Sequence, residues 1–214
     1  MKHLKQFITE YIIKKKLDKP IDSENYYKYY PKTTEELTDN INELIKQDIY
    51  DFNCINTSEI TDMSYLFKNL YNIKIKENDF DVSSWDVSKV TTMSSMFCGC
   101  KNFEGKGIEN WDVSNVTNMS DMFNDCNKFD CDLSNWNIGN VTNMYSMFEN
   151  CENFNCNLSN WNVSKLKYAS YMFANCKSFE GKGLENWDIS NVKNMQFMFY
   201  NCKSLKNKPA WYKE

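Results

Sequence analysis

Few residues in this sequence are of the types that carry out catalysis. The chain has one histidine, His3, close to the start of the sequence. Ser-His-Asp and Cys-His catalysis both need a histidine as general base, and many metal sites need one as a ligand. Aspartate and glutamate are plentiful, but they recur with a sequence repeat, whereas an active site is normally a single asymmetric group. The sequence therefore predicts no catalytic residue, no cofactor site and no metal site, and we expect the protein not to be an enzyme.

Cysteine is the other reactive residue type, and the chain has nine of them. Five cysteines occupy one equivalent position, three residues after a repeated Met-Phe pair: Cys100, Cys126, Cys151, Cys176 and Cys202. The first repeat has Leu70 at this position, so the cysteine behaves as a small apolar residue. Since free cysteine is among the most buried residue types, we expect buried free thiols rather than disulfide bonds or zinc ligands. Stacked thiols in adjacent repeats remain able to oxidise.

The element that positions these residues is a repeat of 25 or 26 residues. The repeated tryptophans mark it: Trp85, Trp111, Trp136, Trp161 and Trp187. Met-Phe pairs recur with the same steps, from Met96-Phe97 to Met198-Phe199. Self-similarity at a period of this size is typical of stacked supersecondary units.

Two hydrophobic periods follow one another within residues 133–157, LSNWNIGNVTNMYSMFENCENFNCN. Trp136 and Ile138 alternate as one face of a short strand does. Four apolar residues then stand at i, i+3, i+4 and i+7, as on two helical turns: Met144, Met147, Phe148 and Cys151. Each unit is therefore predicted to contain a short strand that leads into a short helix. The units must stack, because neither element can bury its apolar face alone.

The wording LSNWDVSNVTNMSxMFxxCxxF resembles the BspA-like leucine-rich repeat family. Its LxxWxIxxV part has the spacing of the leucine-rich repeat strand, with Trp in a Leu position. The match runs over residues 52 to about 205, with units that begin at Phe52, Val82, Ile108, Leu133, Leu158 and Leu184. The resemblance implies an α/β fold: a right-handed leucine-rich-repeat-like solenoid of about six short strand-plus-helix coils with an N-terminal helical cap. It also implies an interaction role and a bacterial surface location.

The two open ends of such a stack need cover. Residues 1–50 are predicted to form a helical cap, with an apolar stripe at Leu4, Phe7, Ile8, Tyr11 and Ile12. Thr33 and Glu36 form a capping box before a second helix. An amphipathic helix here has the alternative role of binding a partner or a membrane. Residues 51–214 are predicted to form the solenoid, and residues 206–214 its C-terminal stub, which places Trp211 and Tyr212 over the last coil.

Charge and hydropathy limit the classes of partner and the cellular location that we expect. The net charge is -4, and all 25 basic residues are lysine, so the bidentate guanidinium that recognises phosphate and guanine is missing. We therefore expect no nucleic acid partner. The N-terminal segment lacks the pattern of a secretory signal, and no segment has the apolar length to span a bilayer. The expectation is a cytoplasmic monomer without membrane insertion, and the family resemblance offers the cell surface as the alternative.

The remaining candidate site is the polar face of the predicted strands. One residue per unit flanks the inward tryptophan and is predicted to point outward: Asp86, Asp112, Asn137, Asn162 and Asp188. One unit departs from the consensus with Lys165, Lys167 and Tyr168. These eight residues are the predicted binding site for a protein partner, with a glycan as the alternative.

Other interpretations of this face stay open. Its Asn and Ser side chains have the alternative role of hydrogen-bonding one another and the backbone on a solvated surface. The protein as a whole would then be a structural spacer or scaffold. A third hypothesis is an adhesin-like surface protein exported without a recognisable signal.

Overall fold

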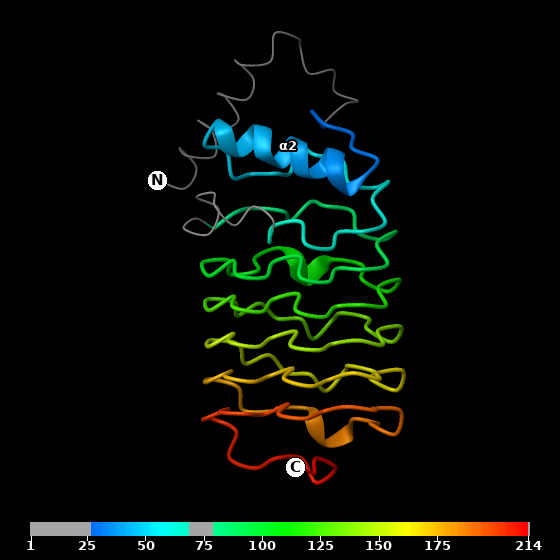
Figure 1. Ribbon diagram of the computed structural model, residues 1–214, viewed down its shortest axis with the longest axis vertical. Coiled ribbons are helices and arrows are strands. Elements are labelled where there is room, and N and C mark those ends of the chain that lie inside the picture. The colour runs from blue at the N-terminus through cyan, green and yellow to red at the C-terminus, as the bar shows by residue number, and fades with distance from the viewer. Residues whose placement is uncertain (1–26, 69–78, 214) are drawn as a thin grey trace.

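The computed structural model describes residues 27–68 and 79–213 of the 214-residue chain. The apolar stripe predicted from Leu4 to Ile12 lies outside these described residues. In the described part, successive repeats form coils that are stacked along the long axis of the molecule (Figure 1). Isolated parallel bridges join equivalent residues of neighbouring coils, such as Asn118 to Asn143.

Each coil is a succession of β-turns. In the coil formed by residues 133–157, the backbone N–H of Trp136 donates to the carbonyl of Leu133 at 3.0 Å. Cys151 donates in the same way to Phe148, also at 3.0 Å. Hydrogen bonds between residues i+3 and i close β-turns. The three-residue spacing of the apolar side chains is therefore the spacing of turn ends, with mostly polar residues between them.

Two residues in each complete coil adopt left-handed backbone conformations. Ser146 (φ 49°) stands between Met144 and Met147, and Asn150 (φ 63°) precedes Cys151. The equivalent pairs in later and earlier coils are Asp121 and Asp125, Tyr171 and Asn175, and Phe197 and Asn201. A left-handed residue interrupts a right-handed helix at once. The apolar stripe therefore cannot be helical, although its spacing is that of a helix.

The predicted α/β fold, a right-handed leucine-rich-repeat-like solenoid of strand-plus-helix coils, is wrong. The described residues contain one α-helix, α2 (Thr34–Lys46), and two short 3₁₀ helices, η2 (Ile108–Asn110) and η3 (Leu184–Asn186). They contain no continuous strand, only isolated bridges. The physical reason is that turn ends three residues apart give the same apolar pattern as a helix, and alternation over three residues is too short to define a strand.

One segment of each coil carries the repeated methionines, residues 144–150 in the coil formed by residues 133–157, and we call it the Met-rich segment. The main-chain N–H groups of this segment that bond to another coil all donate to the following coil. The N–H groups of Met144, Ser146 and Phe148 each donate at 2.9 Å to carbonyls of the following coil. The acceptors are the carbonyl oxygens of Tyr168, Ser170 and Met172. The same direction holds at every described interface from Met63 to Asn175. The segment therefore turns its carbonyls towards the preceding coil and its N–H groups towards the following coil.

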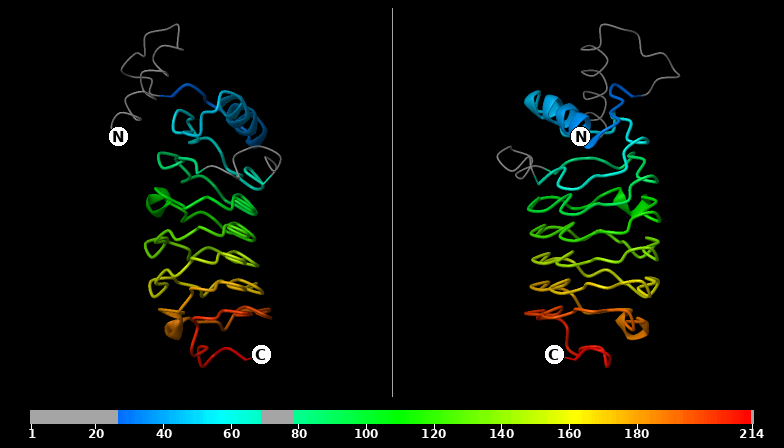
Figure 2. Two further views of the ribbon diagram at one scale, coloured as in Figure 1. Left: turned by 90° about the vertical axis from the view of Figure 1, so that its left-hand side faces the viewer. Right: turned by 45° about the vertical axis from the view of Figure 1, so that its right-hand side comes forward.

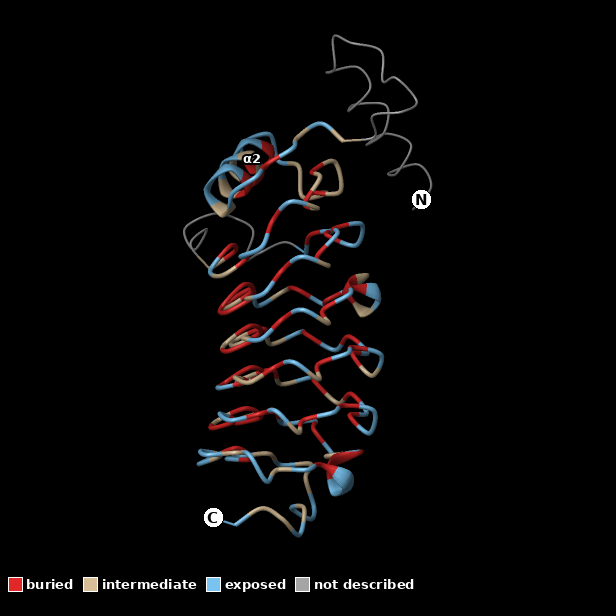
Figure 3. Cartoon of the chain, turned by 90° about the vertical axis from the view of Figure 1, so that its right-hand side faces the viewer, coloured by how far each residue is buried: buried red, intermediate tan, exposed pale blue. Residues whose placement is uncertain are grey.

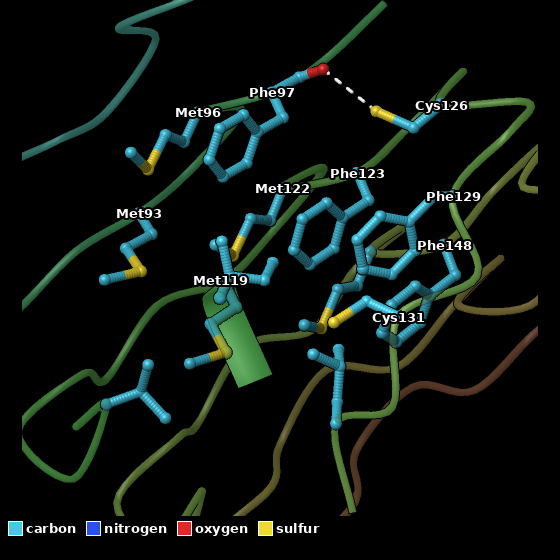
Figure 4. Close-up of a cluster of buried hydrophobic side chains, with 14 of the residues drawn as sticks. Met93, Met96, Phe97, Met119, Met122, Phe123, Cys126, Phe129, Cys131 and Phe148 are labelled. Carbon is cyan, nitrogen blue, oxygen red and sulfur yellow. Dashed lines mark hydrogen bonds between the residues drawn. The ribbon is translucent and has the colours of Figure 1, made fainter. Parts of the chain in front are cut away.

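Stacked phenylalanine rings fill the core. The rings of Phe97, Phe123 and Phe148 lie 5.5 and 5.6 Å apart between centroids, with interplanar angles of 2° and 11°. Phe129 contributes a second ring to the same layer, 4.1 Å from Phe123 (Figure 4). Burying one such ring contributes about 1.5–3 kcal/mol. Every described coil contributes buried residues, coloured red in Figure 3.

All nine cysteines are free thiols, as predicted. Four of the five repeated cysteines are also buried, whereas Cys202 in the last coil is half-buried. The repeated cysteines do more than fill space, because the thiols of Cys126, Cys151, Cys176 and Cys202 each donate to a carbonyl of the preceding coil. The bond from Cys126 Sγ to the Phe97 oxygen measures 3.0 Å (Figure 4). Cys202 repeats it in the last coil at 2.9 Å to Phe173.

Helix α2 lies across the N-terminal end of the stack (Figures 1 and 2). Its predicted apolar stripe is buried: Leu37, Ile41, Leu44 and Ile45. Thr33 caps the helix by accepting from the N–H of Glu36 at 3.2 Å. The Glu36 carboxylate accepts from the N–H of Lys32 at 2.7 Å, one residue before the position that a capping box requires. Thr34 Oγ1 donates to the carbonyl of Asp62, which ties the helix to the first coil.

At the opposite end, Trp211 takes the place that a tryptophan holds in each of the five preceding coils. Its Nε1 donates to the carbonyl of Leu184 at 2.8 Å, and its ring stacks 6.2 Å from Trp187. Earlier tryptophans make the same bond, as Trp136 does to Ile108 at 2.9 Å. Trp111 is an exception, with a buried Nε1 that has no partner among the described residues.

Candidate partner-binding surface

The five repeated residues of the predicted binding face form local turns. Each uses Oδ1 to accept the N–H of the residue two positions later, at distances of 3.0 to 3.3 Å. These five are Asp86, Asp112, Asn137, Asn162 and Asp188. They form one column, one residue per coil, and each has one oxygen occupied in fixing its own turn.

Electrostatics follow from the same turns. Hydrogen bonds from the side chain and then the main chain of Ser88 lower the pKa of Asp86 below its usual value. Ser190 lowers the pKa of Asp188 in the same order. Hydrogen bonds to a carboxylate favour its charged form. These two carboxylates are therefore ionised acceptors held in turns, and neither has the raised pKa expected of a general acid.

Lys165 interrupts a ladder that links neighbouring coils. In three other coils the equivalent residue is asparagine, and Asn140 donates its side-chain amide to the carbonyl of Ser114 at 2.8 Å. Glu59 and Lys89 hold the position in the first two coils. Lys165 instead donates to Asn140 Oδ1 at 2.7 Å. The main chain of Lys167 donates to Thr142 at 2.8 Å as the repeat requires, so only its side chain departs from consensus. Tyr168 is 44% exposed.

The structure reveals a surface that was not predicted. Tyr145, Phe197 and Tyr200 are exposed large aromatic residues, with 43%, 53% and 60% of their surface accessible. Half-buried Tyr171 joins them, because its ring lies 6.1 Å from Tyr145 and 5.2 Å from Phe197. Phe197 in turn lies 6.3 Å from Tyr200. We call these four residues the aromatic patch. It spans the last three coils, and Tyr168 stands three residues before Tyr171 in the same coil.

Two members of the aromatic patch have strained backbones. Tyr171 and Phe197 both have φ of 57°. This left-handed region suits glycine, asparagine and aspartate, whereas a bulky residue there is an outlier. The same position holds Ser95, Asp121 and Ser146 in the three coils before them, and Tyr65 in the first coil. The last two coils therefore keep aromatic residues where small polar residues fit the backbone better.

The sequence does contain a signal for this patch. The two residues between the repeated Asn-Met and Met-Phe are Ser120-Asp121 in the consensus unit. They become Tyr145-Ser146, then Ser170-Tyr171, then Gln196-Phe197. A consensus of the units hides this gradual change from small polar to aromatic residues. A comparison of the units with one another reveals it.

A shallow pocket lies near the N-terminal end of the stack. Tyr50, Asp79, Asp81, Lys106 and Glu109 are among its lining residues. Burial raises the pKa of Asp79. Burial also opposes ionisation of Asp81, but hydrogen bonds from Ser83 outweigh it and lower the pKa. The described residues contain no group of three or more His, Cys, Asp or Glu side chains placed to hold a metal ion.

Within residues 27–68 and 79–213, no helix combines the length and the apolar character that crossing a bilayer requires. The folded features therefore define a class: a repeat protein, in which a stack of turn-built coils encloses ladders of phenylalanine and cysteine.

Comparison with known families agrees with this class. Residues 33–104, 71–182 and 146–212 match the family described as "Mycoplasma protein of unknown function, DUF285". The chain belongs to this family. Neither the curated proteins nor the solved structures provide a significant match. The repeat character is thereby supported, whereas the resemblance to BspA-like leucine-rich repeats is not confirmed.

Proposed function

We propose that this chain is a non-enzymatic binding module that engages a protein partner through the aromatic patch. One observation carries the proposal: the stacked rings of Tyr171 and Phe197 are held at positive φ on the surface. A residue in the left-handed region costs about 1–2 kcal/mol. Such strain gathers at functional sites, where something other than folding maintains it.

The residue types favour a protein partner. Tyrosine is enriched among residues that dominate binding energy, and aromatic residues are enriched in protein interfaces. The rings of the patch meet at steep angles, 68° between Tyr145 and Tyr171 and 88° between Phe197 and Tyr200. They present edges as well as faces, which suits an uneven protein surface better than the ring face of a sugar.

A structural spacer is the second candidate function. It is favoured by the column of turn-forming residues, from Asp86 to Asp188, whose Oδ1 atoms accept local N–H groups. A face whose polar groups are engaged within the fold needs no ligand to explain it. The two candidates differ in what they expect of the aromatic patch, because a spacer has no use for it.

The test begins with a photo-crosslinker placed at exposed Gln196, between Met195 and Phe197, to identify a partner in native cells. Affinity is then measured with the purified partner. The double variant Tyr171→Ser, Phe197→Asp places residues that the same column uses elsewhere, and we expect it to bind at least about ten-fold more weakly.

The matched control is Tyr65→Ser. Tyr65 occupies the same column in the first coil, with φ of 62° and 46% exposure, but lies at the other end of the stack. Its substitution should leave affinity unchanged. Equal binding by the wild type and the double variant contradicts the proposal. A folded bait that crosslinks to nothing moves the conclusion to the spacer.

A further inference from the structure

The last coil ends the one-directional ladder with donors that have no acceptor. In the preceding coil, the N–H groups of Ala169, Tyr171 and Asn175 donate to the last coil at 2.8 to 3.0 Å. The equivalent groups in the last coil belong to Met195, Phe197 and Asn201, and none of them has an acceptor among the described residues. By the repeat, these N–H groups point away from the stack, to where another coil would lie.

The C-terminal stub leaves this edge accessible. Trp211 and Tyr212 pack on Phe199, which is 3% exposed and carries the remaining donor of the row. Phe197 and Asn201 on either side are exposed, and Met195 is half-buried. Unpaired edge groups of this kind are a template for another extended chain.

Charge adds a second observation. Lys193, Lys203, Lys206, Lys208 and Lys213 are the charged residues between positions 190 and 213, and no aspartate or glutamate occurs there. The chain as a whole has more acidic than basic residues, with 29 against 25. Lys193 and Lys203 flank the donor row in sequence. The end that offers free N–H groups is therefore also locally basic.

We propose that this edge binds an extended acidic peptide segment of a partner protein by main-chain pairing. Alternate carbonyls of the segment would accept from Met195, Phe197 and Asn201, and its carboxylates would lie near Lys193 and Lys203. The three donors lie two and four residues apart, on a row with a two-residue period in which only Phe199 is covered. This spacing matches carbonyls along one side of an extended chain and exceeds what a single small anion can fill. Addition of a strand to an open edge gives affinity through the main chain and specificity through side chains.

A second copy of this chain fits the edge less well. Its complementary surface would be the carbonyls of the first coil, such as that of Asp62. That carbonyl already accepts from Thr34 Oγ1, and helix α2 lies across that end of the stack. The inference rests on the proposed function only in taking the partner to be a protein, because the donors are main-chain groups rather than side chains of the aromatic patch.

The test is amide hydrogen exchange by NMR on the full chain, with a synthetic peptide as the probe. The peptide NMSDMFND copies residues 118–125, which supply carbonyls to the neighbouring coil and contain two aspartates. At 90% occupancy we expect exchange of the Met195, Phe197 and Asn201 amides to slow by roughly ten-fold. The Ala169, Tyr171 and Asn175 amides serve as internal references, since they are paired with or without peptide.

Charge is tested separately. Lys203→Glu should weaken peptide binding roughly three- to five-fold at low salt. Lys101→Glu is the matched control, because Lys101 also follows the ladder cysteine and is exposed, but lies in a distant coil. A control peptide with both aspartates replaced by lysine should not protect the three amides.

The outcomes separate this inference from the proposed function. Absence of protection at saturating peptide, or equal protection by the lysine peptide, overturns it. Protection that appears without peptide as protein concentration rises assigns the edge to a second copy and also overturns it. If the partner binds wild type but not Tyr171→Ser, Phe197→Asp, and the edge amides stay unprotected in that complex, the proposed function stands and this inference fails.

Discussion

The thiol of Cys126 donates a hydrogen bond to the main-chain carbonyl of Phe97 in the preceding coil, across a Sγ–O distance of 3.0 Å. Cys151 and Cys176 repeat the bond at 3.0 and 2.9 Å. Burial raises the pKa of all three thiols well above the usual value. A thiolate has no proton to donate, so ionisation would break the bond and leave a charge in the core.

Stability should therefore fall in alkaline solution. The unfolded thiols lose protons above about pH 8.5, while the folded thiols keep them, so the unfolded state binds fewer protons. The free energy of unfolding then decreases by about 1.4 kcal/mol per pH unit for each buried thiol, from the unfolded pKa up to the folded one. Urea unfolding at pH 7 to 10 under reducing conditions measures this slope. Cys126→Ala should make the slope shallower by the contribution of one thiol, about 1.4 kcal/mol per pH unit. An unchanged slope contradicts the explanation.

Phe148→Ala should destabilise the protein strongly. Phe148 is fully buried, and its ring stacks between Phe123 and Phe173 at 5.6 and 5.7 Å. Loss of a buried phenylalanine side chain costs about 3–5 kcal/mol. Phe199→Ala, at the end of the same column, should cost less because only one neighbouring coil stacks on it. Urea unfolding compares the two variants, and equal losses would show that stacking along the column is not what stabilises it.

Tyr171→Asn should maintain or raise stability although it removes a large side chain. Asparagine tolerates the φ of 57° better than tyrosine, so relief of strain is expected to be worth up to about 1 kcal/mol. Tyr145→Asn is the control, since Tyr145 is exposed but not among the residues with positive φ. Thermal unfolding should show a higher midpoint for Tyr171→Asn than for Tyr145→Asn. The reverse order would remove the argument from strain.

Gly183→Ala should disrupt the turn before η3. Gly183 has φ of 87°, and an added Cβ would lie 2.1 Å from the backbone nitrogen of Ser159. Backbone cannot move aside cheaply, so we expect a loss of at least about 2 kcal/mol. Gly139→Ala is the matched control, because its nearest neighbour would be a side-chain oxygen at 3.4 Å. Circular dichroism during urea unfolding measures both, and a neutral Gly183→Ala would contradict the crowding seen here.

Predictions from the sequence were correct where a residue pattern is produced by only one kind of structure. The 25- or 26-residue spacing of Trp136 and its equivalents identifies the repeat. The cysteines at the position that Leu70 holds in the first repeat are free thiols, as predicted. The buried stripe of α2, from Leu37 to Ile45, follows from a helical period together with a Thr33 cap. These signals have no strong competitor.

The prediction of a helix in each coil failed because a helix and a succession of β-turns produce the same spacing of apolar residues. Residues such as Met144, Met147 and Cys151 satisfy helical spacing, but turns closed three residues apart satisfy it equally. Deciding between them requires the backbone conformation of Ser146 and Asn150. Serine gives no warning of positive φ, and the preference of asparagine for it is only a weak signal in a sequence rich in asparagine. The aromatic patch was missed for another reason, because a consensus averages away Tyr171 and Phe197.

The ladder of one-directional hydrogen bonds also bears on how such a chain changes over evolutionary time. Along the Met-rich segment, each coil accepts from the coil before it and donates main-chain N–H groups to the coil after it, with the same groups at every described interface from Met63 to Asn175. An in-frame duplication or deletion of one unit, from any residue to its equivalent in the next coil, therefore leaves matched surfaces at the junction. Unequal recombination between the coding repeats would lengthen or shorten the molecule by whole coils, while α2 and the stub with Trp211 would remain at the two ends.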